Sequence, residues 1–109
     1  MKKVLLILFV CIFSASVLAV ETKYKKIDRV QINSKASDGN TYYYFVNEGG
    51  WGATGCVDAI YATMKDTDGG ANAFLSLVLS AKATGAEVKF YGSCESTNIY
   101  FQVNYVILK

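Results

Sequence analysis

The stretch from Asp68 to Cys94, DGGANAFLSLVLSAKATGAEVKFYGSC, constrains the fold more than any other part of the chain. Helix-forming residues fill positions 71–82, and apolar side chains recur among them at helical spacing. The predicted helix therefore has one apolar face, made by Phe74, Leu75, Val78 and Ala81. Asp68 or Asn72 is a candidate N-cap, because a short polar side chain can accept an orphan backbone N–H. Gly85 fits the left-handed position that follows many helices.

The apolar period changes after Gly85. Apolar and polar residues alternate over positions 86–91, with Ala86, Val88 and Phe90 on one side. This alternation predicts a half-buried strand. The simplest interpretation of the whole unit is a structural core, so the evidence for function must come from other segments.

The first nineteen residues are typical of a secretory signal peptide. Lys2 and Lys3 precede a short apolar run over positions 4–13, and small residues precede a cleavage site expected after Ala19. The apolar run is too short to span a membrane. We therefore expect a single mature domain of residues 20–109, periplasmic or secreted, with no membrane anchor after cleavage.

Charge and cysteine content narrow the possible partners. Without Lys2 and Lys3, nine basic residues face nine acidic ones, so the mature chain lacks the basic field that nucleic acid or an anionic membrane would require. Cys56 and Cys94 remain after cleavage, and two cysteines in an exported domain predict one disulfide. Two thiols without any histidine offer too few ligands for a metal site.

Four further segments have strand character, at positions 27–33, 41–47, 56–63 and 99–107. The segment at 56–63 fits a helix or a strand, and we favour a strand because a helix start signal already lies at 66–70. Ile27 is out of phase with the apolar residues after it, which predicts a bulge near Asp28. With the strand at 86–91, the helix lies between strands three and four of five. The predicted fold is mainly β with one helix (α+β), as a small five-stranded OB-like barrel.

This order of elements, the signal peptide and the helix–glycine–strand unit over Ala73–Tyr91 resemble the receptor-binding B subunits of AB5-type toxins. The similarity is to the subtilase-cytotoxin and pertussis-toxin-like group, and it extends more loosely over Tyr42–Cys94. The chain lacks the extra cysteine pairs that are common in that group. The resemblance implies glycan binding by a subunit that assembles into a homo-oligomeric ring.

The sequence offers little to an enzyme. There is no histidine, which removes the usual general base and the Ser–His pair. Asp66 and Asp68 lie where a helix start favours acids, and no glutamate completes a calcium loop after them. The glycine-rich segment at 49–52 has no P-loop lysine. We expect no catalysis, no metal and no cofactor.

The remaining candidate site combines aromatic rings with polar neighbours. It consists of Tyr42, Tyr44, Trp51, Asn47 and Glu48. Sugars present apolar C–H faces and hydroxyl rims, which aromatic rings beside amide and carboxylate groups can match. The alternative is that the tyrosines pack across strands and Trp51 fills one end of the barrel.

The sequence thus predicts a small exported module that binds a glycan or an extracellular protein. A structural or inhibitory envelope protein, which covers a partner protein and needs no small-ligand site, is the alternative function.

Overall fold

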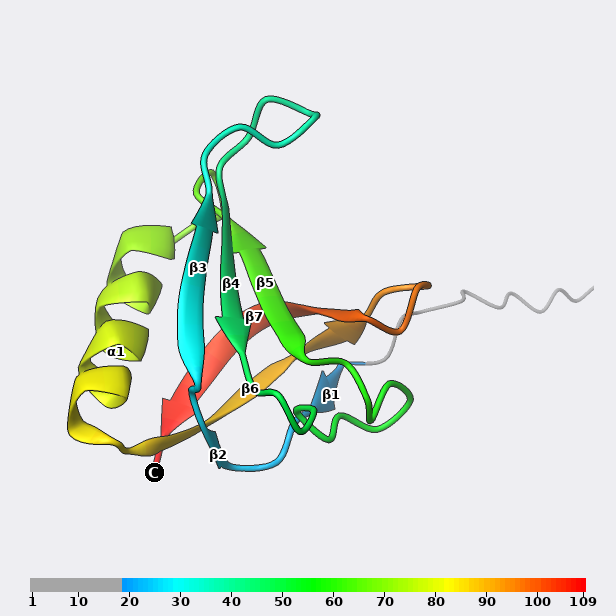
Figure 1. The fold of residues 1–109 in the computed structure, drawn as a ribbon, viewed down its shortest axis with the longest axis vertical. Coiled ribbons are helices and arrows are strands. Elements are labelled where there is room, and N and C mark those ends of the chain that lie inside the picture. The colour runs from blue at the N-terminus through cyan, green and yellow to red at the C-terminus, as the bar shows by residue number, and fades with distance from the viewer. Residues whose placement is uncertain (1–18) are drawn as a thin grey trace, which may run out of the picture.

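The computed structural model describes residues 19–109, so the predicted signal peptide lies outside the described residues except for Ala19 (Figure 1). The described chain is mainly β with one helix, α1 (Ala71–Thr84), between β5 and β6. Its strands are β1 (Val20–Glu21), β2 (Lys25–Lys26), β3 (Arg29–Asn33), β4 (Tyr42–Val46), β5 (Tyr61–Lys65), β6 (Glu87–Cys94) and β7 (Tyr100–Leu108).

The seven strands form one mixed sheet in the order β1-β6-β7-β5-β4-β3, and β2 also pairs with β6. All neighbouring strands are antiparallel except β5 and β7, which are parallel. Parallel neighbours require a crossover connection, and here the chain crosses through α1 and β6 before it returns as β7. The crossover places α1 along one side of the sheet (Figure 1).

The predicted five-stranded barrel is wrong, because the sheet is not closed. The strand expected over 27–33 is divided at Ile27 and Asp28, where the chain leaves one strand partner for another. β2 pairs with β6, whereas β3 pairs with β4 at the far edge of the sheet. The irregularity expected near Asp28 is therefore larger than a bulge. The predicted position of the helix, between the third and fourth of the five longer strands, is confirmed.

The strand predicted over 56–63 is correct only at its end, since β5 begins at Tyr61. The preceding residues bond to the glycine-rich loop instead of to a neighbouring strand. Ala59 accepts a hydrogen bond from the Trp51 N–H at 2.9 Å, and Val57 accepts one from the Gly52 N–H at 3.2 Å. Val57 is consequently 57% exposed and has no core role.

The apolar face of α1 is confirmed. Val78 and Ala81 are buried, and Phe74 and Leu75 pack against the same core. Gly85 follows the helix with a φ of 73°, as predicted.

Neither predicted side-chain N-cap is used. Gly70 occupies the capping position with a φ of 75°, and no side chain caps the helix. Asp68 instead accepts a hydrogen bond from the Lys65 N–H at 2.9 Å, which ties the end of β5 to the start of the turn. The Asp68 carboxylate thus bonds to the Lys65 N–H, two residues before the capping position, and does not cap α1.

Aromatic rings fill the space between α1 and the sheet. Phe90 of β6 stacks on Phe45 of β4 and on Phe74 of α1, with ring centroids 5.8 Å and 6.0 Å apart. Phe45 and Phe90 are fully buried. The predicted strand over 86–91 therefore contributes its apolar side to the core, and the strand itself continues to Cys94.

Apolar and polar residues alternate over positions 99–107 of the sequence, which predicts one buried side for this strand, but the pattern of burial departs from that alternation after Val103. Tyr91 pairs with Tyr105 and Gly92 pairs with Val103, so the register of β6 and β7 shifts at this point. Beyond the shift Val106 packs against the core, whereas Tyr105 is 51% exposed. Gly92 permits the close approach, because a Cβ there would lie 1.8 Å from the Gln102 carbonyl oxygen.

We expect Val78→Asp to unfold the domain, because it places an unpaired carboxylate on the buried face of α1 at a cost of several kcal/mol. Ser76→Asp adds the same group to the exposed side of the helix and should change the free energy of unfolding by only about 0.5 kcal/mol. Thermal denaturation followed by circular dichroism compares the two. Equal melting temperatures for Val78→Asp and the unchanged protein would show that this face is not packed.

Candidate functional site

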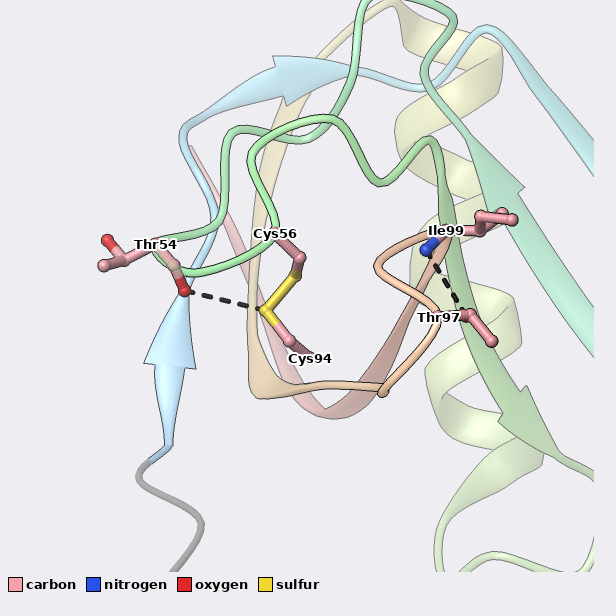
Figure 2. The surroundings of a disulfide bond; sticks show 5 residues. All are labelled: Thr54, Cys56, Cys94, Thr97 and Ile99. Atoms are coloured by element: carbon pink, nitrogen blue, oxygen red, sulfur yellow. Dashed lines mark hydrogen bonds between the residues drawn. A yellow bond between two sulfur atoms is a disulfide. The ribbon is translucent and has the colours of Figure 1, made fainter.

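A disulfide joins the glycine-rich loop to the end of β6. Cys56 and Cys94 are bonded, with their Cα atoms 5.9 Å apart, as the cysteine count predicts (Figure 2). The Thr54 carbonyl oxygen lies 3.6 Å from Cys94 Sγ, a contact without a hydrogen bond because a disulfide sulfur carries no proton (Figure 2). Disulfides persist in oxidising, extracytoplasmic compartments, in keeping with export. Within residues 19–109, no helix is long and apolar enough to cross a membrane.

Trp51 lies in the core and not on a surface. Its side chain is fully buried, and its Nε1 donates a hydrogen bond to the Phe45 carbonyl oxygen at 3.0 Å. Its ring packs edge-to-face on Phe90, with centroids 4.8 Å apart. Trp51 therefore has the packing role that was the alternative in the sequence, and its ring is not accessible to a ligand.

Asn47 and Glu48 stabilise the loop that carries Trp51. The Asn47 amide donates to the Lys26 carbonyl oxygen at 2.9 Å and accepts from the Gly49 N–H at 3.1 Å. Glu48 forms an ion pair with Arg29 of β3. Neither residue joins Tyr42 and Tyr44, so the structure does not bring the five predicted site residues together.

Tyr42 and Tyr44 line a hollow on the face of the sheet opposite α1. Phe45 of β4 faces the helix, so its neighbour Tyr44 must face away from it. The hollow has a volume of about 310 Å³. We call it the tyrosine hollow. The residues that line it include Asp38, Tyr42, Tyr44, Thr63, Glu95 and Tyr100. The β6–β7 hairpin, which supplies Glu95, projects on the side away from α1 (Figure 1).

The strand register explains why the tyrosines gather. Tyr44 pairs with Thr63 across β4 and β5, and Tyr61 pairs with Tyr100 across β5 and β7. The ring of Tyr44 lies 5.8 Å from that of Tyr61 and 6.0 Å from that of Tyr100, centroid to centroid. The rings thus pack across strands, as the alternative interpretation predicted, yet all of them remain partly exposed.

Thr63 forms part of the floor of the hollow and is only 4% exposed. Its hydroxyl oxygen has no hydrogen-bond partner within residues 19–109. Buried polar groups are nearly always paired, because an unpaired hydroxyl loses its bonds to water without compensation. Because Thr63 is one of the residues that line the hollow, a polar group of a ligand is a candidate partner for this hydroxyl.

Asp38 gives the hollow a negative wall. Its carboxylate accepts a hydrogen bond from the Tyr42 hydroxyl at 2.6 Å and another from the Asn40 N–H at 2.9 Å. The bond from Tyr42, followed by that from Asn40, lowers the pKa of Asp38 below its ordinary value. The same bond raises the pKa of Tyr42. Asp38 is therefore firmly ionised at neutral pH, and Tyr42 is held as its donor.

Sequence reasoning missed Thr63, Glu95, Tyr100 and Asp38. The alternation of residues 99–107 could have placed Tyr100 on the side opposite Phe101, away from the core. Only the parallel pairing of β5 with β7, which joins segments far apart in sequence, brings Tyr100 beside Tyr61.

Comparisons with protein-family models, with curated proteins and with solved structures find no match for this chain.

The environment of Trp51 predicts its fluorescence and its contribution to stability. Its emission should be blue-shifted and poorly quenched by iodide, because the ring is enclosed. Trp51→Ala should lower the free energy of unfolding by about 3 kcal/mol or more. A quenchable tryptophan whose removal leaves stability unchanged would place the ring on the surface.

Tyr42→Phe should raise the pKa of Asp38 toward its ordinary value, because the variant removes the principal donor to the carboxylate. A pH titration of the Asp38 carboxyl carbon by NMR measures this directly. Tyr105→Phe, which alters a tyrosine stacked on Tyr91, is the matched control and should leave the Asp38 pKa unchanged. An unaltered pKa in Tyr42→Phe would mean that the hydrogen bond does not form in solution.

Proposed function

We propose that this chain is a small exported binding module that binds a glycan in the tyrosine hollow. One observation carries the proposal: partly exposed tyrosine rings surround a buried hydroxyl, that of Thr63, which lacks a partner in the described chain. The rings offer apolar faces and phenol groups, and Thr63 offers a fixed polar contact below them. This combination suits a ligand with apolar C–H faces and a rim of hydroxyls.

The size and position of the hollow agree with such a ligand. Its volume of about 310 Å³ is at the lower end of the range of small-molecule sites, enough for one or two sugar rings. It is built from β4, β5 and β7, from the end of β3 and from two connections, so regular strands hold the rings while the connections supply Asp38 and Glu95. Rigid strands with polar loops at their ends are a common arrangement of binding sites.

The resemblance to AB5-toxin B subunits supports the same function and is part of the proposal. The position of α1 between the third and fourth of the five longer strands supports a relation to the OB fold, although the sheet is not closed into a barrel. We include in the proposal that the chain acts without catalysis or a cofactor and assembles with further copies of itself. A structural or inhibitory protein that covers a partner protein remains the alternative outcome of the test.

Two buried threonines provide a matched test. Thr63→Val removes the unpaired hydroxyl without changing the shape of the side chain, so the free energy of unfolding should stay equal or rise. Thr22→Val removes a hydroxyl that accepts from the Phe90 N–H at 2.9 Å and donates to the Lys23 carbonyl oxygen at 3.0 Å. Thr22→Val should therefore lower stability by about 1–3 kcal/mol.

The two variants should affect ligand binding in the opposite order to their effects on stability. A glycan array identifies a ligand, and calorimetry then compares the variants. Thr63→Val should weaken binding about tenfold, which corresponds to about 1.4 kcal/mol, whereas folded Thr22→Val should bind normally. Unchanged glycan affinity in Thr63→Val would contradict the proposed site. A protein that binds no glycan but captures a protein partner would support the alternative function.

A further inference from the structure

We infer that the ligand of the tyrosine hollow is a glycan bearing protonated amino groups, of the glucosamine type, in preference to acidic or uncharged glycans. The inference rests on the proposed function and specifies its ligand class. It follows from the charge of the hollow and from the hydrogen-bonding capacity that its carboxylates retain.

The charged side chains that line the hollow are both acidic. Asp38 comes from the β3–β4 connection and Glu95 from the β6–β7 hairpin, and no lysine or arginine of residues 19–109 lines the hollow with them. Two basic residues flank the hollow without lining it: Lys35 lies between the lining residues Asn33 and Ala36, and Lys65 pairs with Tyr42 and helps to lower the pKa of Asp38. The residues that line the hollow therefore carry two negative charges and no positive one.

Both carboxylates can still accept hydrogen bonds. Each Asp38 oxygen accepts one bond, from Asn40 or from Tyr42, and each carboxylate oxygen has two lone pairs. The Glu95 side chain has neither an ion pair nor a hydrogen bond within residues 19–109. An ammonium group has three donors and no acceptor, so it fits two unsaturated carboxylates better than a hydroxyl does.

The aromatic walls favour the same group. Tyrosine faces attract a cation that lies within about 6 Å of the ring centroid. Tyr44 and Tyr100 lie with their centroids 6.0 Å apart, so a ligand seated on one ring is close to the other. The buried Thr63 hydroxyl then pairs with a neighbouring sugar hydroxyl, an observation independent of the acidic residues. A glycan carboxylate here would meet like charges, which oppose binding.

Three oligosaccharide probes separate charge from shape. Calorimetry with the exported protein compares glucosamine tetramer, N-acetylglucosamine tetramer and sialyllactose at a pH where the amines are protonated. The two tetramers share a backbone and differ mainly in charge. We expect the glucosamine tetramer to bind at least about tenfold more tightly than the acetylated one, and sialyllactose to bind most weakly. Added salt should reduce the preference.

Neutralising variants locate the source of the preference. Glu95→Gln should remove most of it while the acetylated tetramer binds as before, and Asp38→Asn should act in the same direction. Glu48→Gln is the matched control, because Glu48 is an exposed acid that pairs with Arg29 outside the hollow, and it should leave the preference unchanged.

The failures of the two proposals are distinguishable. Equal binding of the tetramers, strongest binding of sialyllactose, or a full preference in Glu95→Gln would overturn the charge inference while glycan binding stands. If none of the three probes binds and the glycan array is also empty, both the inference and the proposed function are overturned.

Discussion

One helix can cover only one face of a sheet, and the rest of this structure depends on that constraint. The face beneath α1 holds the phenylalanine core, and it excludes water by the usual apolar packing. The opposite face has no helix above it in the described chain. Its side chains must therefore pack against those of adjacent strands and also contact water. Tyrosine meets that requirement, because its ring packs on adjacent strands while its hydroxyl stays wet. A tyrosine-rich hollow is thus a direct consequence of one-sided coverage.

The open end of the core is filled by the loop between β4 and β5. Trp51 inserts from this loop and bonds to the Phe45 carbonyl oxygen, and the disulfide at Cys56 fixes the loop to β6. Closing 38 residues of chain stabilises the fold by about 4 kcal/mol in the chain-entropy model. Gly50 allows the first part of the loop to lie close to its last part, since a Cβ at Gly50 would lie 2.7 Å from the Val57 carbonyl oxygen. The loop is a structural element, and this explains why its polar residues do not serve the hollow.

Local patterns in the sequence were sufficient to predict the elements in which apolar side chains recur with one regular spacing. The helix face around Val78, the strand around Phe90 and the Cys56–Cys94 bond follow from spacing and from the expected export. The barrel did not follow, because the change of strand partner at Ile27 depends on tertiary pairing that no local period encodes. The same limit applies to the site. Tyr42 and Tyr44 could be chosen from their alternation, whereas Tyr100 reaches them only through the parallel pairing of β5 and β7.

For Trp51 the sequence allowed two interpretations, and the structure has the packed one. A tryptophan among glycines has the sequence signature of an exposed platform, but a flexible loop can equally fold its ring inward when an apolar gap exists.

The most direct test of ligand binding in the tyrosine hollow is an NMR titration of the labelled protein with glucosamine tetramer. We predict that shift changes concentrate on the ring signals of Tyr44 and Tyr100 and on the Thr63 methyl group. Changes confined to Tyr91 and Tyr105, which stack on each other across β6 and β7 and do not line the hollow, would contradict the assignment of the tyrosine hollow as the binding site.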